Sequence, residues 1–295
     1  MKKIGITTTV PLEILIAAGY QPVDLNNVFI SDPDPEHLVR LAERDGFPLN
    51  CCSWIKGIYG VCMQSDIDTV LCVTNGDCSN TIMLMEVLNL KGLKTIPFAY
   101  PEQPDTNQMQ FRLEALAKKF NTTLGAAEAV KQELVDGCHK RPAYPDDILR
   151  IAYTGVPSVY GQDLYKYLET KGARVVFNEI QRQFAMPQPG DSLAEQYSNY
   201  TYPYSIHHRL KDITTELERR RVDGLIHYVQ AFCHRGIGDI IFHNTIKLPI
   251  LTLEGNDDFY LNQHIKTRVE AFIDMLKRNP KRQKHKNRTA VKQAS

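Results

Sequence analysis

The chain has 295 residues, which fits two domains of about 100–200 residues each. With 43% hydrophobic and 23% charged residues it has the composition of an ordinary globular protein, and no apolar run reaches the ~18 residues that a membrane span needs. The formal net charge of +1 conceals an asymmetry. Residues 277–295 hold eight Lys or Arg and no acid, which leaves 27 basic against 34 acidic residues elsewhere. This acidic body argues against a nucleic-acid-binding core. The basic tail is either a solvated, disordered end or a contact for nucleic acid or an acidic partner.

The order of predicted elements is that of an α/β protein. Short apolar runs of strand character alternate with amphipathic segments, which predicts parallel sheets joined by right-handed crossovers. In the first half we predict strands at 4–9, 22–30, 68–74 and 94–99, helices at 11–19, 35–44, 79–91 and 106–135, and a segment of helical character at 51–63. In the second half we predict strands at 149–154, 173–178, 223–229 and 248–253, helices at 159–171, 207–220, 234–242 and 261–277, and a polar loop at 186–205.

Two prolines divide the chain, because Pro142 and Pro145 stop the last helix of the first half and precede a new unit. The pattern predicts an N-terminal α/β domain at 1–143, a C-terminal α/β domain at 144–278 and a basic disordered tail at 279–295. Both domains are predicted to be doubly wound parallel sheets. Because such sheets bind ligands outside the carboxyl ends of their strands, we expect a site in the cleft between the domains.

The two halves repeat one another. Residues 67–78 (IDTVLCVTNGDC) are answered by residues 222–233 (VDGLIHYVQAFC), where an aspartate leads into an apolar run, an amide residue follows, and a cysteine falls ten positions after the aspartate. Residues 3–11 resemble 149–157 in the same way, and 96–100 resemble 248–252. The repeat indicates an internal duplication that places Cys78 and Cys233 just past the ends of equivalent strands.

The cysteines suggest a reducing compartment and a possible metal site. Seven cysteines without the spacing of a disulfide scaffold, and no predicted signal peptide, indicate the cytoplasm. The pair Cys51 and Cys52 supplies a third candidate thiol beside Cys78 and Cys233. The intervals of 25 residues between Cys52 and Cys78 and 154 between Cys78 and Cys233 lack the paired ligands of structural zinc sites and the clustered cysteines of ferredoxins. Two readings stay open here: three thiolates that hold a cluster between the domains, or small buried hydrophobic residues.

Seven segments spread over both halves match one family pattern. They are residues 11–23, 155–157, 172–179, 200–204, 222–235, 253–256 and 267–276. Over residues 5 to about 277 the chain therefore resembles the D-component family of 2-hydroxyacyl-CoA dehydratases, which includes the benzoyl-CoA reductase cluster subunits and the double-cubane cluster proteins. No single short motif carries the resemblance.

The resemblance implies a cofactor and partners. Its members bind one [4Fe-4S] cluster per subunit through three cysteines, which correspond here to Cys52, Cys78 and Cys233, with Cys51 as the alternate to Cys52. It also implies an iron with an open coordination site, low-potential reductive chemistry, an oxygen-sensitive protein, an acyl-CoA substrate, and a homodimer or a heterodimer with a paralogous subunit. The cluster is charged by an ATP-dependent activator protein, and this chain has no Gly-x-x-x-x-Gly-Lys-Ser/Thr loop of its own.

Two departures from the family pattern keep several functions open. Family members usually carry a helical region before the first α/β domain, whereas the first strand is predicted here near residue 3, which disfavours a thioester substrate. Asn256 stands where an acidic residue usually follows Glu-Gly. The first hypothesis is a subunit of a dehydratase-like lyase or reductase complex. The second is a double-cubane-type small-molecule reductase or electron-transfer accessory, and the third is a metal-free bilobal small-molecule-binding protein.

Residues beside the predicted ligands have two readings each. His234 and Arg235 follow Cys233 and are the candidates for contact with cluster sulfide or substrate; the alternative is that they only cap and solvate a helix. Trp54 and Lys56 either shield the cluster and stabilise its negative charge or simply pack.

Two further sets of residues are predicted to have no role in the cluster site. Tyr197, Tyr200, Tyr202 and Tyr204 resemble an aromatic platform for single-stranded nucleic acid, which the acidic body disfavours. The remaining cysteines, Cys62, Cys72 and Cys138, are predicted to be structural.

Overall fold

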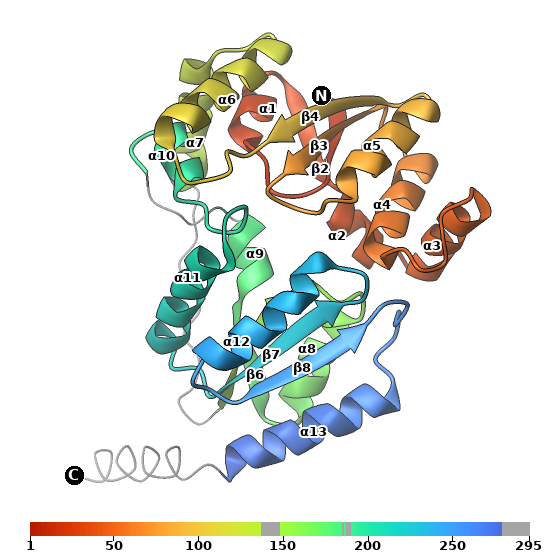
Figure 1. The fold of residues 1–295 in the computed structure, drawn as a ribbon, viewed down its shortest axis with the longest axis vertical. Helices are drawn as coiled ribbons and strands as arrows, with labels where there is room; N and C mark the ends of the chain where they lie inside the picture. The colour runs from red at the N-terminus through yellow and green to blue at the C-terminus, as the bar shows by residue number, and fades with distance from the viewer. Residues whose placement is uncertain (137–147, 185, 187–189, 279–295) are drawn as a thin grey trace. The chain divides into compact units, whose positions relative to one another are not determined.

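The computed structural model describes residues 1–136, 148–184, 186 and 190–278. The chain forms two compact units. The first comprises Met1–Lys140 and Gln183–Arg209, and the second comprises Arg141–Arg182 and Leu210–Ser295. Each unit is built around one parallel sheet (Figure 1).

The sheet of the first unit has four parallel strands in the order β2-β1-β3-β4. The strands are β1 (Lys2–Ile6), β2 (Tyr20–Asp24), β3 (Thr69–Asn75) and β4 (Lys94–Ala99). Its helices are α1 (Leu12–Ala17), α2 (Leu25–Ser31), α3 (Pro35–Arg44), α4 (Ser53–Gln64), α5 (Thr81–Leu90), α6 (Thr106–Lys119), α7 (Leu124–Asp136) and α10 (Leu193–Ser198). In Figure 1, α1, α6 and α7 lie on one side of this sheet and α4 and α5 on the other.

The sheet of the second unit has the same design, with the order β6-β5-β7-β8 and all strands parallel. The strands are β5 (Leu149–Gly155), β6 (Ala173–Asn178), β7 (Gly224–Gln230) and β8 (Ile250–Gly255). The helices are α8 (Gly161–Thr170), α9 (Glu179–Phe184), α11 (Ile206–Arg219), α12 (Asp239–Thr245) and α13 (Gln263–Lys277), with the 3-10 helix η1 (His234–Gly238). In both sheets the strands run second, first, third, fourth, so the predicted fold class and duplication are confirmed.

Alternating side chains of β7 show how the second sheet is covered on both faces. Ile226 and Tyr228 belong to a buried cluster with residues of α8 and α13. His227, between them, points to the opposite face and stacks on Phe242 of α12 with ring centroids 4.1 Å apart. Successive strand residues point to opposite faces, so a strand covered on both sides reads as a continuous apolar run.

Three predicted elements differ in the structure because of local capping. Residues 25–31 form helix α2 rather than the end of a strand, since the Asp24 carboxylate accepts a hydrogen bond from Asn26 N at 3.0 Å and starts a helix. The single helix predicted at 106–135 is two helices, because Asn121 takes a left-handed conformation (φ 54°) and Thr123 Oγ1 caps α7.

The third difference lies in the predicted polar loop at 186–205, which contains α10. Ser192 Oγ accepts a hydrogen bond from Glu195 N at 3.1 Å, and the Glu195 side chain accepts one from Asp191 N at 2.8 Å. Ser192-Leu193-Ala194-Glu195 has the Ser-x-x-Glu spacing of a capping box, which the sequence alone displays.

The structure also differs from the predicted domain boundary, because residues 183–209 belong to the first unit rather than the second. Tyr197 of α10 is buried and its hydroxyl lies 3.0 Å from Val10 O and 2.9 Å from Glu13 Oε2. This contact ties the segment to α1. The predicted linker at 141–147, the boundary at 143 and the tail at 279–295 lie outside the described residues.

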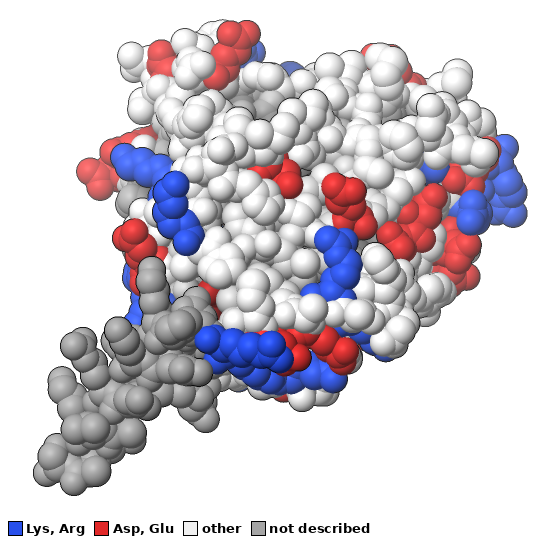
Figure 2. Space-filling view, turned by 60° about the horizontal axis from the view of Figure 1, so that its bottom comes forward, with Lys and Arg blue, Asp and Glu red and all other residues white. Residues whose placement is uncertain are grey.

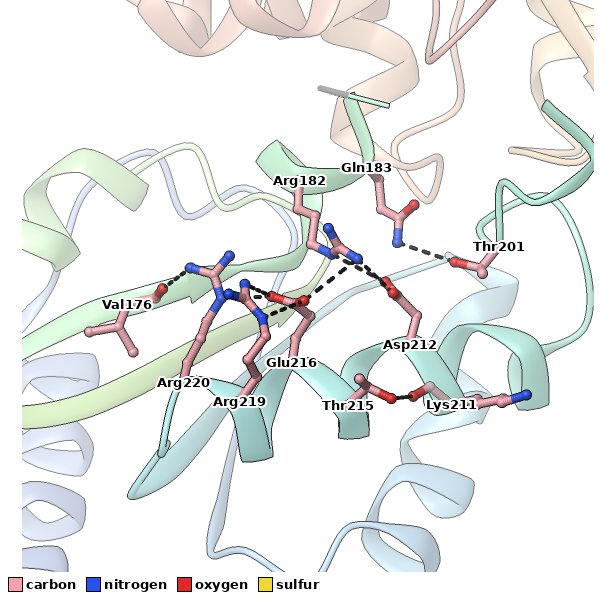
Figure 3. Close-up of polar contacts among 10 residues, drawn as sticks. All are labelled: Val176, Arg182, Gln183, Thr201, Lys211, Asp212, Thr215, Glu216, Arg219 and Arg220. Atoms are coloured by element: carbon pink, nitrogen blue, oxygen red, sulfur yellow. Dashed lines mark hydrogen bonds and ion pairs between the residues drawn. The ribbon is translucent and has the colours of Figure 1, made fainter. Parts of the chain in front are cut away.

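An ion-pair network joins the two helices in which the 183–209 segment begins and ends (Figure 3). Arg182 of α9 donates two hydrogen bonds to the Asp212 carboxylate of α11, at 2.7 and 3.3 Å. The neighbouring Glu216 carboxylate accepts from Arg219 at 2.6 Å and from Arg220 at 2.8 Å. The network therefore fixes α9 against α11 at the base of the segment.

Charged side chains are mixed on the surface. Figure 2 shows Lys and Arg scattered among Asp and Glu on the face drawn, with broad uncharged areas between them. No helix in the described part of the chain is long and apolar enough to cross a membrane.

Candidate functional site

Cys78 and Cys233 occupy equivalent turns at the carboxyl edges of the two sheets. Each lies three residues after the last residue of the third strand of its sheet, β3 or β7. In both turns the cysteine carbonyl accepts a backbone hydrogen bond from the residue three positions on, Thr81 N at 3.1 Å and Gly236 N at 2.9 Å. Both cysteines are partly exposed. The repeat in the sequence therefore produces the same local geometry twice.

The amide residue before each cysteine has the same task in both units. Asn75 Nδ2 donates to Tyr100 O at 2.8 Å, just after β4, and Gln230 Nε2 donates to Asn256 Oδ1 at 2.9 Å, just after β8. These bonds tie each cysteine turn to the loop that follows the neighbouring strand. Asn256, which departs from the family pattern, thus accepts a hydrogen bond from the second cysteine turn.

Each turn also contains a residue in the left-handed region. In the first unit this is Gly76 (φ 98°), where a Cβ would come within 2.7 Å of Pro203 Cβ. In the second unit it is Phe232 (φ 62°), directly before Cys233 and 56% exposed. A left-handed non-glycine residue is strained, and such strain is frequent at ligand-binding positions.

The cysteine turns flank the topological switch points of the sheets. In both sheets the strand order reverses direction between the first and third strands, β1 and β3 or β5 and β7. Ligands of doubly wound sheets bind at that reversal, outside the carboxyl ends of the strands. The thiols of Cys78 and Cys233 are therefore placed where the fold class binds ligands.

Cys52 is brought to the same edge of the first sheet by helix α4. It is the N-cap residue of α4, is buried, and its carbonyl accepts from Lys56 N at 3.3 Å. Because α4 ends just before β3 begins, the helix runs back along the sheet and its N-terminus lies toward the carboxyl edge. Cys51, the alternate, is only partly buried, and burial raises the pKa of its thiol while the charge of Lys56 lowers it.

Lys56 is paired within the first unit. Its side chain is completely buried, and Nζ donates to Glu43 Oε1 at 2.7 Å and to Leu49 O at 3.1 Å. The hydrogen bond from Lys56 holds the pKa of Glu43 below its usual value. The lysine therefore anchors α4 to α3 and to the turn before Cys51.

Trp54 has features of both predicted roles, core packing and contact with a cluster. Its ring packs edge-on against Phe29 with centroids 5.3 Å apart, as expected of a core residue. Its Nε1 is nevertheless buried with no hydrogen-bond partner among the described residues. A buried donor without an acceptor is unusual and costs about 1–3 kcal/mol, so this N–H is available to an acceptor that the chain itself does not supply.

Two of the other cysteines fit a structural role. Cys62 and Cys72 are buried, and burial raises the pKa of both thiols to about 12. Since a metal ligand must be a thiolate, such thiols are poor ligands at neutral pH. Cys138 lies outside the described residues.

His234 and Arg235 lie in η1, directly after Cys233, so the predicted helix there begins as a 3-10 turn before α12. His234 is exposed and Arg235 is partly buried. The exposed imidazole is thus accessible beside the cysteine turn, as a contact residue requires.

The tyrosines do not form a platform for nucleic acid. Tyr197, Tyr200 and Tyr204 are all buried, and Tyr200 packs against Tyr100 with centroids 5.7 Å apart. Stacking of bases needs exposed rings. Tyr197 and Tyr200 instead belong to the hydrophobic core of the first unit, and Tyr202 packs against it.

No group of three or more His, Cys, Asp or Glu side chains in metal-binding positions occurs among the described residues. Two of the predicted ligands, Cys52 and Cys78, belong to the first unit and the third, Cys233, to the second. No single unit therefore contains the whole predicted set.

Two parallel sheets of identical order, each with a cysteine turn after its third strand, define an internally duplicated α/β protein with a thiol at the carboxyl edge of each sheet. The sequence profile described as 2-hydroxyglutaryl-CoA dehydratase, D-component, matches residues 7–127 and, a second time, residues 115–276. The chain belongs to this family, which confirms the resemblance found in its sequence and supports a dehydratase-like subunit. A search of curated proteins gave no match.

Proposed function

We propose that this chain is the cluster-binding subunit of a 2-hydroxyacyl-CoA dehydratase-like enzyme and that it holds one [4Fe-4S] cluster through Cys52, Cys78 and Cys233. The observation that carries the proposal is the equivalence of the Cys78 and Cys233 turns, each three residues past a third strand at a topological switch point. Both thiols are partly exposed at the edge where doubly wound sheets bind ligands, unlike the buried thiols of Cys62 and Cys72.

The donor set suits a cluster held by thiolates. Cys52 is the N-cap of α4, Cys233 is the N-cap of η1, and Cys78 lies in the turn that starts α5. Backbone N–H groups at helix starts carry partial positive charge, which stabilises a negatively charged ligand nearby. The buried, unpartnered Nε1 of Trp54, two residues from Cys52, suits a hydrogen bond to cluster sulfur.

When bound, such a cluster supplies a one-electron donor and an iron with an open coordination site. The chain's own residues would position and shield it: α4 is held by the Lys56–Glu43 pair, and the cysteine turns by Asn75 and Gln230. His234, exposed beside Cys233, is the candidate for contact with a substrate.

The proposal includes partners. An ATP-dependent activator would deliver the electron, since the sequence has no phosphate-binding loop of the Gly-x-x-x-x-Gly-Lys type. The second subunit of a dimer, identical or paralogous, and an acyl-CoA substrate complete the complex.

The proposal is tested by purifying the full chain without oxygen and counting iron and acid-labile sulfide. We expect about four irons per chain, as in a [4Fe-4S] centre. Cys78→Ala, Cys233→Ala and Cys52→Ala should each lose most of the iron. Cys51→Ala should retain it, as should the matched control Cys72→Ala, which removes a buried thiol six residues before Cys78.

Two outcomes would overturn parts of the proposal. A colourless, iron-free protein from oxygen-free preparation would leave a metal-free small-molecule-binding protein as the better account. A loaded cluster whose EPR signal is unchanged by every member of a thioester panel would favour the second candidate, a double-cubane-type reductase or electron-transfer accessory, over a dehydratase.

A further inference from the structure

The turn between β5 and α8 in the second unit has the form of a binding loop. Gly155 ends β5 with φ 103°, and a Cβ there would lie only 2.1 Å from Tyr228 O, so the backbone passes directly against β7. The chain then enters α8 at Gly161, and no side chain caps the first turn of that helix. This turn lies at the switch point between β5 and β7.

One buried hydroxyl at this turn has no partner. Ser158 is 3% exposed, and its Oγ makes no hydrogen bond among the described residues. The same Oγ lies 3.6 Å from the position that a Cβ of Gly161 would take, so it sits against the first residue of α8. Gly161 N donates to Ser158 O at 3.0 Å, so the donors left at this helix start are the Ser158 hydroxyl and the backbone N–H groups of Gln162 and Asp163, which no side chain caps.

In the first unit, the helix start that follows the first strand has a polar side chain of its own. Residues 3–11 correspond to 149–157 in the internal repeat, and two residues after Pro11 comes Glu13 at the start of α1. Its buried carboxyl accepts hydrogen bonds from its own backbone N–H and from Tyr197 Oη. In the first unit, therefore, a carboxyl group of the chain itself occupies the helix start after the first strand. In the second unit the residue that corresponds to Glu13 is Val159, and the buried polar group at this helix start is the Ser158 hydroxyl.

We propose that the N-terminus of α8 binds an oxyanion, with Ser158 Oγ and the backbone N–H groups of Gln162 and Asp163 as donors. The oxyanion is the carboxylate of an organic acid or the phosphate of a nucleotide-type ligand, since both present oxygens to a helix start in the same way. The site requires no iron–sulfur cluster, so its test is independent of the function proposed above.

Asp163 is exposed in the first turn of α8 and should lower the affinity of the site for anions. Its carboxylate repels an incoming anion and competes for the positive end of the helix. Removing that charge by Asp163→Asn should therefore tighten binding, whereas removing the hydroxyl by Ser158→Ala should weaken it. The two substitutions thus give opposite expectations at one site.

The test is a titration of the isotope-labelled full chain with inorganic phosphate, acetate and, for ionic strength, chloride, followed by the backbone amide signals of Gly161 and Gln162. We expect saturable shifts with phosphate or with acetate, and the anion that saturates at the lower concentration identifies the source. Ser158→Ala should raise Kd about tenfold, the effect of losing one charge-assisted hydrogen bond. Thr170→Ala, which removes a hydroxyl at the other end of α8, should leave Kd unchanged.

Thermal melting provides the second measurement. Because Ser158 Oγ has no partner, Ser158→Ala should fold and melt at or slightly above the temperature of the unsubstituted chain. Shifts that do not saturate, or that are equal in chloride, would overturn the proposal, as would an unchanged Kd in Ser158→Ala.

Discussion

The contact between Tyr197 and Glu13 predicts how the 183–209 segment is held to the first unit. Tyr197 is 1% exposed, and its hydroxyl lies 3.0 Å from Val10 O and 2.9 Å from Glu13 Oε2. Burial raises the pKa of Glu13. The Tyr197 hydroxyl is thus the donor that both buried acceptors, Val10 O and Glu13 Oε2, share.

The substitution Tyr197→Phe removes this hydroxyl without changing the ring. It leaves buried Val10 O and Glu13 without their partner, and unsatisfied buried groups cost about 1–3 kcal/mol. For a unit of this size the melting temperature should fall by about 2–4 °C per kcal/mol. Tyr20→Phe, which deletes a hydroxyl from a partly buried tyrosine of the same unit, should change it little.

The assay is urea unfolding followed by tryptophan fluorescence, because the only tryptophan of the chain, Trp54, lies in the first unit and reports its unfolding. Amide hydrogen exchange of α10 should accelerate in Tyr197→Phe while that of α13 stays unchanged. A midpoint equal to that of Tyr20→Phe, with α10 still protected, would refute the reasoning.

The pH dependence gives the same contact a second test. Because the pKa of Glu13 is higher in the folded state than in the unfolded state, the folded chain binds more protons between the two values. The unfolding free energy contributed by this group therefore falls as pH rises through that window, by at most about 1.4 kcal/mol per pH unit, and is constant above it. Glu13→Gln should lack this slope and be no less stable than the unsubstituted chain at neutral pH.

Three further predictions concern other contacts. Burial would raise the pKa of Glu216, but hydrogen bonds from Arg219 and Arg220 lower it to about 2. The ionised carboxylate therefore stabilises the fold by up to about 3 kcal/mol above its unfolded pKa, and this contribution is lost as pH falls toward 2. Chemical unfolding of Glu216→Gln should accordingly differ from that of the unsubstituted chain at pH 6 but not at pH 2. Gly155→Ala should lower the free energy of unfolding by more than about 3 kcal/mol, because its Cβ would meet Tyr228 O. The control Gly172→Ala has φ 72° and open space around the new Cβ, so it should cost only the backbone strain of about 1–2 kcal/mol. Equal melting curves for the two variants would contradict this. Lys56→Met should lower the free energy of unfolding by about 3–5 kcal/mol, because it leaves Glu43 without its buried partner. The control Arg40→Met removes the exposed partner of Glu43 and should cost less than about 1 kcal/mol in the same denaturation assay.

Much of the fold could be predicted from the residues because parallel α/β domains follow strict rules. Strands that alternate with helices form parallel sheets, and right-handed crossovers place the turns after the strands at one edge. The repeat of 67–78 in 222–233 was therefore enough to predict that Cys78 and Cys233 occupy equivalent turns. The predicted lengths failed where a cap decided the outcome, as at Asp24 and Ser192.

The parts that could not be predicted depend on partners far apart in the chain. The pairing of Lys56 with Glu43, thirteen positions away, could not be read from the residues around it. Trp54 Nε1 and Ser158 Oγ could be recognised as donors without acceptors only once every neighbour was in place.

The sequence by itself determined the duplication, the parallel sheets and the position of a thiol at the carboxyl edge of each, because these follow from periodicity and local connection rules. Only the tertiary structure decided that residues 183–209 belong to the first unit, since Tyr197 and its partner Val10 are 187 positions apart and no local pattern encodes that contact. Only the tertiary structure, too, showed that the helix start filled by Glu13 in the first unit offers an unpartnered serine hydroxyl in the second, because satisfaction of a buried polar group is a property of all its neighbours together.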